Sequence, residues 1–196
     1  MIKRAIFAFL LLFIIACVPN TPEEIKETVE QEVTSQDIAE PGSVVHNATG
    51  PVVSINWKDI ELKDVRTGDL FKISDFNGKT VLLESFAVWC PKCKQQQDIF
   101  KDFAAENPNV VLISLDTDPN EDEERVKGHI NRYGYDWLYA VAPADYTKQL
   151  IDEFGLGIIS APSTPVILIC GDQKTRLTAT GIKDVEELKS EIAKGC

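Results

Sequence analysis

The sequence predicts an α/β domain with a central mixed β-sheet flanked by helices, and three patterns indicate this fold class. Residues 79–88 and 110–115 are largely apolar runs, which are typical of strands covered on both faces. Strand and helix patterns alternate between residues 79 and 157, and such alternation predicts parallel strands joined by helices. Two short strands, 166–170 and 175–180, are expected to form an antiparallel hairpin. The sheet should therefore contain strands of both directions.

The first 17 residues have the pattern of a secretory signal. Lys3 and Arg4 precede an apolar run at residues 5–15, which is shorter than a membrane span needs. The order Ile-Ile-Ala-Cys at residues 14–17 resembles a lipobox, so we expect Cys17 to become a lipidated N-terminus. The alternative is an uncleaved signal anchor. Both interpretations predict a domain outside the cytoplasm that is tethered to a membrane.

An acidic, flexible linker is expected between the signal and the folded domain. Residues 18–50 carry many carboxylates against the single lysine Lys26, and such a segment cannot bury a core. Residues 51–196 are long enough for one domain, which we expect to be a monomer. The net charge of −11 argues against nucleic acid as a partner, because phosphate binding needs clustered Lys and Arg.

A hairpin is expected at the start of the domain. The short apolar segments 58–62 and 69–73 flank Thr67-Gly68, which is a turn signal. We therefore expect two paired strands ahead of the main sheet.

The segment between residues 116 and 157 is expected to add a helix, a strand and a second helix. Asn120 is placed to cap the first helix, whose first turn is acidic. The strand is predicted at 137–141 and the second helix at 146–154. Near the C-terminus, Asp184 and Glu187 form a plausible capping box for the last helix.

Two cysteines separated by two residues lie where the strand 79–88 meets a helix predicted at 91–106. The free N–H groups and the positive end of the helix dipole stabilise a thiolate at Cys90, as does nearby Lys92. We therefore expect Cys90 to be an exposed nucleophile. Cys93 follows about one helical turn later, so its sulfur can approach that of Cys90 and resolve a mixed disulfide.

Glu84 is unexpected on packing grounds, because it lies inside an apolar strand six positions before Cys90. A buried carboxylate without a partner is costly, so burial should raise its pKa. A carboxyl group of this kind can exchange protons with the inner thiol of Cys93. The alternative is a surface acid on an edge strand, but the flanking residues 81–83 and 86–88 look buried on both faces.

The run Trp-Cys-Pro-Lys-Cys at residues 89–93, with an acid six residues before its first cysteine, resembles the thioredoxin superfamily. The segments 59–62 and 68–79 resemble the N-terminal hairpin of its TlpA/ResA type, the membrane-tethered thiol:disulfide oxidoreductases. The resemblance covers roughly residue 52 to the C-terminus. It implies a thioredoxin-like fold with that hairpin and a helix-strand insert at 116–157. One departure is that proline comes first between the cysteines, which leaves the redox potential open.

The resemblance also implies residues that contact the substrate. A cis-proline should lie opposite the nucleophile, and Thr164-Pro165 is the expected position, with Pro162 as the alternative. The substrate strand would then lie along Thr164. Trp89 and Pro91, on either side of Cys90, are expected to contact substrate as well, although Trp89 alone could simply cover the core.

The two remaining cysteines, Cys170 and Cys196, are expected at the same end of the sheet. The last helix should return Cys196 toward the strand that Cys170 closes, and this geometry permits a disulfide. The alternative is two independent thiols.

A resident metal or cofactor is not expected. A structural zinc site needs four ligands, and the chain has no second cysteine pair. His46 and His129 have no ligand spacing and are interpreted as surface residues. Copper-carrying relatives of this fold use three residues between their cysteines, and this chain has two.

Dithiol–disulfide exchange on exported proteins is the function that these observations favour. In the reducing direction Cys90 would attack a substrate disulfide, and Cys93, helped by Glu84, would release the reduced product. The resemblance implies recharging by a membrane electron donor and a link to cytochrome c maturation. A thiol oxidase or isomerase of the same fold and a non-enzymatic Cu(I) carrier remain as alternatives.

Overall fold

The structure is a computed structural model that describes residues 55–196. The predicted signal and the whole of the predicted linker, with Cys17 and His46, lie outside the described residues. Within residues 55–196, no helix combines the length and the apolar character that a membrane crossing requires.

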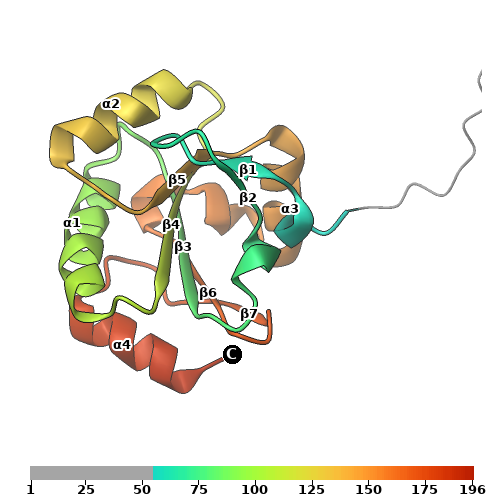
Figure 1. Ribbon diagram of the computed structural model, residues 1–196, viewed down its shortest axis with the longest axis vertical. Helices are drawn as coiled ribbons and strands as arrows, with labels where there is room; N and C mark the ends of the chain where they lie inside the picture. The colour runs from blue at the N-terminus through green and yellow to red at the C-terminus, as the bar shows by residue number, and fades with distance from the viewer. Residues whose placement is uncertain (1–54) are drawn as a thin grey trace, which may run out of the picture. The chain divides into compact units, whose positions relative to one another are not determined.

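The sheet has strand order β5-β4-β3-β6-β7, with β3 at its centre (Figure 1). The strands are β3 (Val81–Phe86), β4 (Val111–Asp116), β5 (Leu138–Val141), β6 (Val166–Ile169) and β7 (Thr175–Leu177). β3, β4 and β5 run parallel, whereas β6 is antiparallel to both β3 and β7. The predicted mixed sheet is confirmed.

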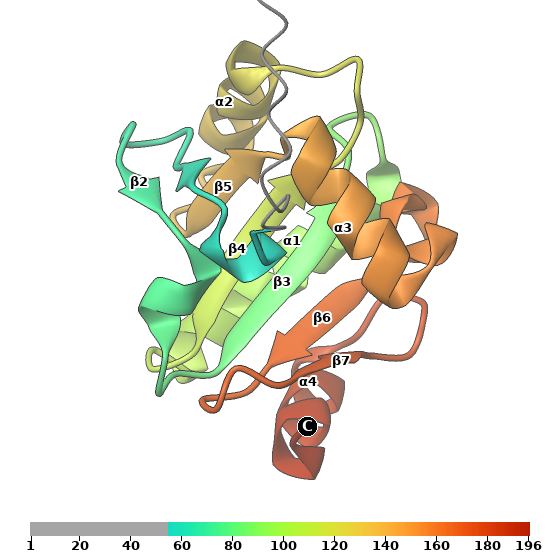
Figure 2. The same ribbon diagram turned by 90° about the vertical axis from the view of Figure 1, so that its right-hand side faces the viewer.

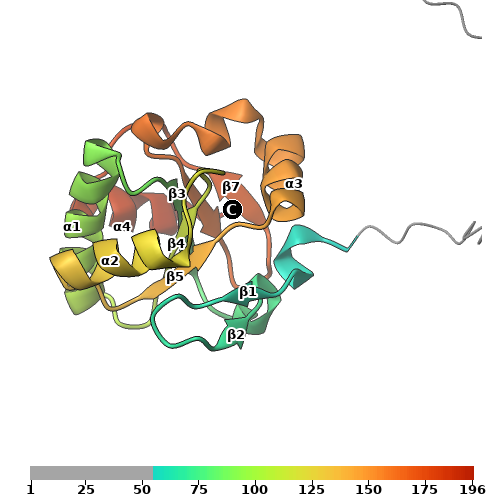
Figure 3. The ribbon, with the colours of Figure 1, turned by 90° about the horizontal axis from the view of Figure 1, so that it is seen from above.

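Helices cover both faces of this sheet. They are α1 (Pro91–Glu106), α2 (Glu123–Tyr133), α3 (Ala144–Phe154) and α4 (Val185–Lys194). Figures 1 and 3 show α1, α2 and α4 on one side of the sheet and α3 on the other. Figure 2, turned by 90°, shows α3 in front of the strands. Short 3₁₀ turns lie at Trp57–Asp59, Ile73–Phe76, Leu156–Ile159 and Ala161–Ser163.

The alternation of side chains along β3 assigns each residue to one of the two cores. Val81 and Leu83 pack in the core on the α3 side, whereas Leu82 and Phe86 pack with α1 on the opposite side. Glu84 shares the parity of Leu82 and Phe86. The backbone therefore turns its carboxyl group toward α1, the helix that begins beside the cysteines.

The predicted N-terminal hairpin is present; its second strand lies within the predicted range 69–73, whereas its first strand begins later than predicted. Its strands are β1 (Leu62–Lys63) and β2 (Leu70–Phe71), while Trp57–Asp59 forms a 3₁₀ turn instead of extended chain. The Trp57 side chain decides this, because it is buried against Tyr146 and donates from Nε1 to Glu153 Oε2 at 2.6 Å.

The residues after β1 cover the outer edge of β5. The N–H of Val65 donates to the carbonyl of Tyr139 at 2.8 Å, and Asp64 Oδ1 accepts the N–H of Tyr139 at 3.3 Å. Both backbone groups of Tyr139 that face away from β4 are thereby hydrogen-bonded, so the β5 edge is not open at this residue.

Helix α2 begins later than the sequence suggested. Its N-cap is Asp122, which accepts the N–H of Arg125 at 2.9 Å, whereas the predicted cap Asn120 is held in a turn by Asp118. Aspartate and asparagine are both strong N-caps, so the sequence could not separate the two positions. The predicted capping box of Asp184 and Glu187 is confirmed for α4.

Candidate active site

Cys90 and Cys93 form a disulfide at the N-terminus of α1. Cys90 is the N-cap residue, with extended backbone, and its Sγ accepts the N–H of Cys93 at 3.2 Å. The two Cα atoms are 5.3 Å apart, which is one helical turn. Pro91, at the first helical position, has no N–H that needs a partner and is exposed there.

The expectation that Cys90 is exposed was wrong for this disulfide form, because only 1% of the residue is accessible. As the N-cap residue, Cys90 turns its sulfur back over the first turn of α1 toward Cys93, and this orientation buries it. The sulfur of Cys93 also lies 3.2 Å from the carbonyl oxygen of Ala161.

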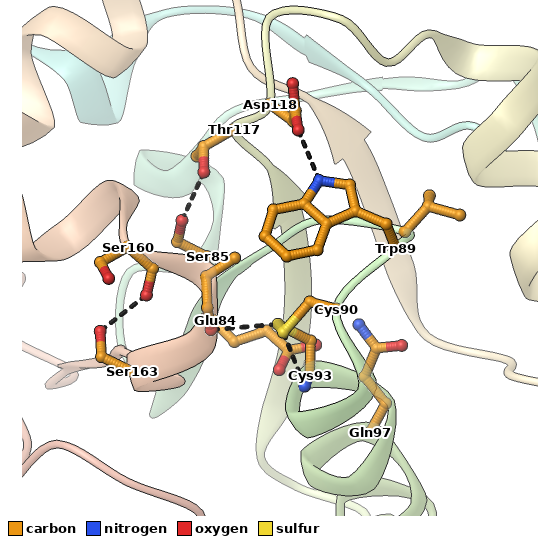
Figure 4. The surroundings of a disulfide bond; sticks show 12 residues. Glu84, Ser85, Trp89, Cys90, Cys93, Gln97, Thr117, Asp118, Ser160 and Ser163 are labelled. Carbon is orange, nitrogen blue, oxygen red and sulfur yellow. Dashed lines mark hydrogen bonds between the residues drawn. A yellow bond between two sulfur atoms is a disulfide. The ribbon is translucent and has the colours of Figure 1, made fainter.

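Trp89 is the large exposed side chain beside the pair, with 60% of its surface accessible. Its Nε1 donates to Asp118 Oδ2 at 2.6 Å, which fixes the ring (Figure 4). This hydrogen bond is the main reason that the pKa of Asp118 lies below its usual range. The partial exposure expected for Trp89 is therefore present, with the ring anchored at one end.

Glu84 is buried, with 2% of its surface accessible, and it lies with Cys93 and Gln97 on the side of the pair away from Trp89 (Figure 4). Burial raises its pKa to about 7, and the hydrogen bond from Ser114 Oγ, at 2.5 Å, opposes this shift. The nearby Gln97 amide and Lys183 charge oppose it further. The alternative of a surface acid on an edge strand was wrong, since β3 is the central strand.

Gln97, a neighbour of this carboxyl group, and its hydrogen-bond partner His129 were both missed. Gln97 lies one turn after Cys93 on the buried stripe of α1, and its Oε1 is 2.6 Å from His129 Nε2. His129 is buried beneath α2, so its interpretation as a surface histidine was wrong. Burial lowers its pKa to about 4 and leaves it neutral at neutral pH. Its position three residues after Val126, on the apolar stripe of α2, was the signal that could have found it.

Lys183, which lies just before α4, is a buried lysine that the sequence did not reveal. Its Nζ donates to the carbonyl oxygen of Thr164 at 2.9 Å and also to that of Gly181. Gln96 on α1 fixes its backbone, because the amide of Gln96 accepts from the N–H and donates to the carbonyl of Lys183. Burial lowers the pKa of Lys183 to about 8, and the charge of Glu84 works against this shift.

The predicted cis-proline was wrong, because residues 55–196 contain no cis peptide bond, at Pro165 or at the alternative Pro162. Thr164 instead reverses the chain with left-handed backbone angles, φ 46° and ψ 56°. This conformation is unusual for a β-branched residue, and the bond from Lys183 to its carbonyl helps to hold it. Thr164 and Pro165 are both buried, and the carbonyl of Pro165 accepts the N–H of Ser85, so the exposed residue of this loop is Pro162.

Two further carboxyl groups, those of Asp116 and Glu121, lie close together next to the loop that leads to the cysteines. Glu121 Oε2 accepts the N–H of Val88 at 2.6 Å, and Asp116 Oδ1 accepts the N–H of Asp118 at 2.9 Å. Burial raises the pKa of Asp116 well above its usual range, and the adjacent Glu121 carboxylate adds to this shift. Glu121 thereby connects the start of α2 to the chain segment before Trp89.

The variant Asp116→Asn is expected to reduce the loss of stability that accompanies rising pH. Because the folded-state pKa of Asp116 is raised, the folded protein retains a proton that the unfolded chain releases near pH 4, so stability falls as pH rises above that value. Asparagine cannot ionise and keeps an oxygen for the N–H of Asp118. Urea unfolding across the pH range, with the exposed Asp136→Asn as control, measures the change; parallel profiles for the wild type and Asp116→Asn would contradict the assignment.

Cys170 and Cys196 are joined by a disulfide, with Cα atoms 6.1 Å apart. The bond ties the end of α4 to the end of β6. Arg176 on β7 adds to this attachment by donating to the carbonyl of Gly195 at 3.0 Å and to the side chain of Glu191 at 2.6 Å. The structure thus has the paired form and not two independent thiols.

Metal ligands are not gathered anywhere in residues 55–196, where no group of three or more His, Cys, Asp or Glu side chains is placed to hold an ion.

The central mixed sheet, the helices on both faces and the cysteine pair at the start of α1 define a thioredoxin-like α/β fold. DsbF of Mycobacterium tuberculosis superposes on this chain with a TM-score of 0.56 at 17% identity, covering 71% of this chain and 97% of that one. The exposed lipoprotein thioredoxin Etrx1 of Streptococcus pneumoniae superposes with a TM-score of 0.55 at 20% identity, covering 69% and 98%.

Residues 47–191 match the Redoxin family, and the chain belongs to this family. Among curated proteins, the protein disulfide isomerase-like 1-3 of rice is 28% identical over 152 residues, which cover 72% of this chain and 27% of the relative. The chain spans less than a third of the length of the curated plant relatives it matches, at 13%, 27% and 31%.

Proposed function

We propose that this protein is a thiol:disulfide oxidoreductase that reduces disulfides in exported proteins. The observation that carries the proposal is the Cys90–Cys93 pair at the N-terminus of α1, with the buried carboxyl group of Glu84 behind Cys93. Membership of the Redoxin family and the similarity to a protein disulfide isomerase-like protein support it.

The reaction begins with the reduced pair. The Cys90 thiolate, which the N-terminus of α1 stabilises, attacks one sulfur of the substrate disulfide. A new S–S bond forms between Cys90 and the substrate, the substrate S–S bond breaks, and its other sulfur leaves as a thiolate that takes up a proton.

Cys93 completes the exchange. Its thiol gives its proton to the Glu84 carboxylate and attacks the sulfur of Cys90, which forms the Cys90–Cys93 disulfide and releases the second substrate sulfur as a thiolate. With a pKa of about 7, Glu84 is divided between its two protonation states near neutral pH, which suits a group that accepts and returns a proton. Two electrons pass to the substrate, and a membrane dithiol donor restores the reduced pair.

The proposed location is outside the cytoplasm, with a lipid on Cys17 holding the domain at a membrane. The signal-like segment 1–17 supports this location, and the similar pneumococcal protein is described as an exposed lipoprotein. The disulfide between Cys170 and Cys196 agrees with an oxidising compartment. Proteins that receive haem through paired cysteines, as in cytochrome c maturation, are the proposed substrates.

The proposal is tested by measuring the reduction potential of the Cys90–Cys93 pair and by trapping substrates with Cys93→Ser. We expect a potential low enough to reduce a protein disulfide such as that of insulin, together with mixed disulfides on Cys90 that accumulate only in Cys93→Ser. A high potential with rapid oxidation of dithiols would replace the reductase by an oxidase. Tight Cu(I) binding without any disulfide exchange would replace it by a copper carrier.

A further inference from the structure

A hollow beside the nucleophile is lined by two arginines that form no ion pair with another residue of the range 55–196. It has a volume of about 320 Å³ and is lined by Val88, Arg125, Gly128, His129, Arg132 and Tyr133. Val88 precedes Cys90 by two residues, so at most about 7 Å of extended chain separates their Cα atoms. The hollow therefore lies within reach of a polypeptide whose disulfide is being attacked.

Arg125 and Arg132 are seven residues apart on α2, which is about two helical turns, so they lie on the same face. Both are exposed, and neither forms an ion pair with any residue in the range 55–196. The guanidinium of Arg132 lies 5.4 Å from the centre of the Tyr133 ring, which orients it at one end of the hollow. Arginine remains charged at every physiological pH, so the hollow presents two fixed positive charges.

Gly128 lies between the two arginines, in the middle of α2. Glycine is unfavourable in the interior of a helix, and a Cβ atom here would meet nothing within 4 Å, so the packing of the fold does not require it. What the missing side chain does provide is the open space between Arg125 and Arg132.

Four carboxyl groups of the neighbouring segments already accept hydrogen bonds, among them Asp98, which accepts from Lys94 and from the hydroxyl of Tyr135. Glu121 accepts the N–H of Val88, Asp118 accepts the indole N–H of Trp89, and Asp122 caps α2 by accepting the N–H of Arg125. The hydrogen bond from Trp89 and, more weakly, the charge of Arg125 lower the pKa of Asp118. Neither arginine, however, is within ion-pair distance of a carboxylate in the described part of the chain, so both guanidinium groups keep donors for a ligand.

His129 forms the floor of the hollow as a neutral side chain. Burial, followed by the charge of Lys94, lowers its pKa, and its Nε2 is committed to Gln97. The same floor is therefore in contact with Gln97, the amide beside Glu84.

We propose that this hollow binds the carboxylate side chain of a substrate polypeptide, so that the protein prefers disulfides with Asp or Glu two or three positions from the attacked cysteine. The guanidinium groups of Arg125 and Arg132 supply the charge and the donors that match a carboxylate. The chain has a net charge of −11 and repels acidic segments elsewhere on its surface. A positive hollow next to the nucleophile therefore determines which residue of an acidic substrate segment lies beside Cys90. This inference rests on the proposed disulfide exchange and adds a substrate class to it.

The test compares two sets of peptide disulfides that differ only by Glu or Gln, with the varied residue moved from three positions before to three positions after the cysteine. With the reduced protein, we expect kcat/KM to be about tenfold higher for a Glu peptide than for the matching Gln peptide when the varied residue lies two or three positions from the cysteine. This preference should be lost at high ionic strength. In Arg125→Gln/Arg132→Gln the ratio should fall to about one, because the rate with the Glu peptide falls.

Two further variants control for charge and space. Gly128→Leu places a side chain between the arginines and should remove the preference without changing any charge. Lys127→Gln, on the same helix but outside the hollow, should leave the ratio as in the wild type. Equal rates for Glu and Gln peptides at every position in the wild-type protein would overturn this inference and leave the proposed exchange intact. Failure to reduce either set would instead overturn the proposed function.

Discussion

Replacing Glu84 by glutamine is expected to slow disulfide exchange about 100-fold at neutral pH, the lower end of what a positioned acid–base group contributes. In the wild-type protein the rate of the step that uses Cys93 should rise with pH through about 7, because only the ionised Glu84 can accept the thiol proton. Glutamine cannot ionise, so this rise should disappear. Stopped-flow measurement of mixed-disulfide resolution across pH gives both quantities.

The same substitution is expected to stabilise the fold. The folded-state pKa of Glu84, about 7, lies above its ordinary value of 4.5, so the ionisation of Glu84 lowers stability as the pH rises from 4.5 to about 7, and the loss stays constant above that pH. Glutamine avoids this cost while keeping an oxygen for Ser114. At alkaline pH the variant should therefore be more stable than the wild type by up to about 3 kcal/mol, at 1.36 kcal/mol per unit.

A slower but more stable protein separates a catalytic role from a structural one. Loss of packing alone would lower activity and stability together, whereas removing a costly functional group raises stability. The exposed Glu61→Gln serves as the control and should change neither quantity. Rates for Glu84→Gln that match the wild type at every pH would remove Glu84 from the mechanism.

The double substitution Cys170→Ser/Cys196→Ser is expected to lower the free energy of unfolding by about 3–4 kcal/mol. The disulfide spans 26 residues, and opening it restores the conformational entropy that the closed loop removes from the unfolded chain. For a domain of this size the midpoint of thermal unfolding should fall by about 10 °C. Urea and thermal unfolding measure both changes.

The reduction potential of the Cys90–Cys93 pair should remain as in the wild type, because β3 and β6 are antiparallel and Cys170 therefore lies at the opposite end of these strands from Cys90. Arg176→Met is the matched comparison, since it removes the other attachment of α4 and leaves the disulfide in place. A loss below about 1 kcal/mol in the double variant would mean that the bond contributes little in solution.

The elements with strong local signals were predicted well. Helix α1 has the predicted bounds, since proline at its first position and the buried stripe through Phe100 and Phe103 define it. The burial and raised pKa of Glu84 followed from its apolar flanks alone. In contrast, the later start of the first hairpin strand depends on the side chain of Trp57 packing against α3, a contact that no local pattern contains.

The surroundings of the cysteines were less predictable because they depend on residues far apart in the chain. Lys183 is 19 positions from Thr164, and only the fold brings its ammonium to that carbonyl. His129 reaches Gln97 in the same way, from 32 positions away. The left-handed backbone of Thr164 was also not predicted, and its carbonyl is the group that the distant Lys183 contacts.

The hydrogen bonds that Tyr139 makes at the edge of β5 have a consequence for the release of a substrate polypeptide. An unfolded substrate polypeptide is largely extended, and it could pair with an open edge strand through backbone hydrogen bonds. Such pairing would slow its release. Asp64 and Val65 already hydrogen-bond the outward backbone groups of Tyr139, so a substrate strand cannot pair with β5 at this residue. After the covalent link is broken, the substrate polypeptide therefore has no backbone pairing with Tyr139 to delay its release.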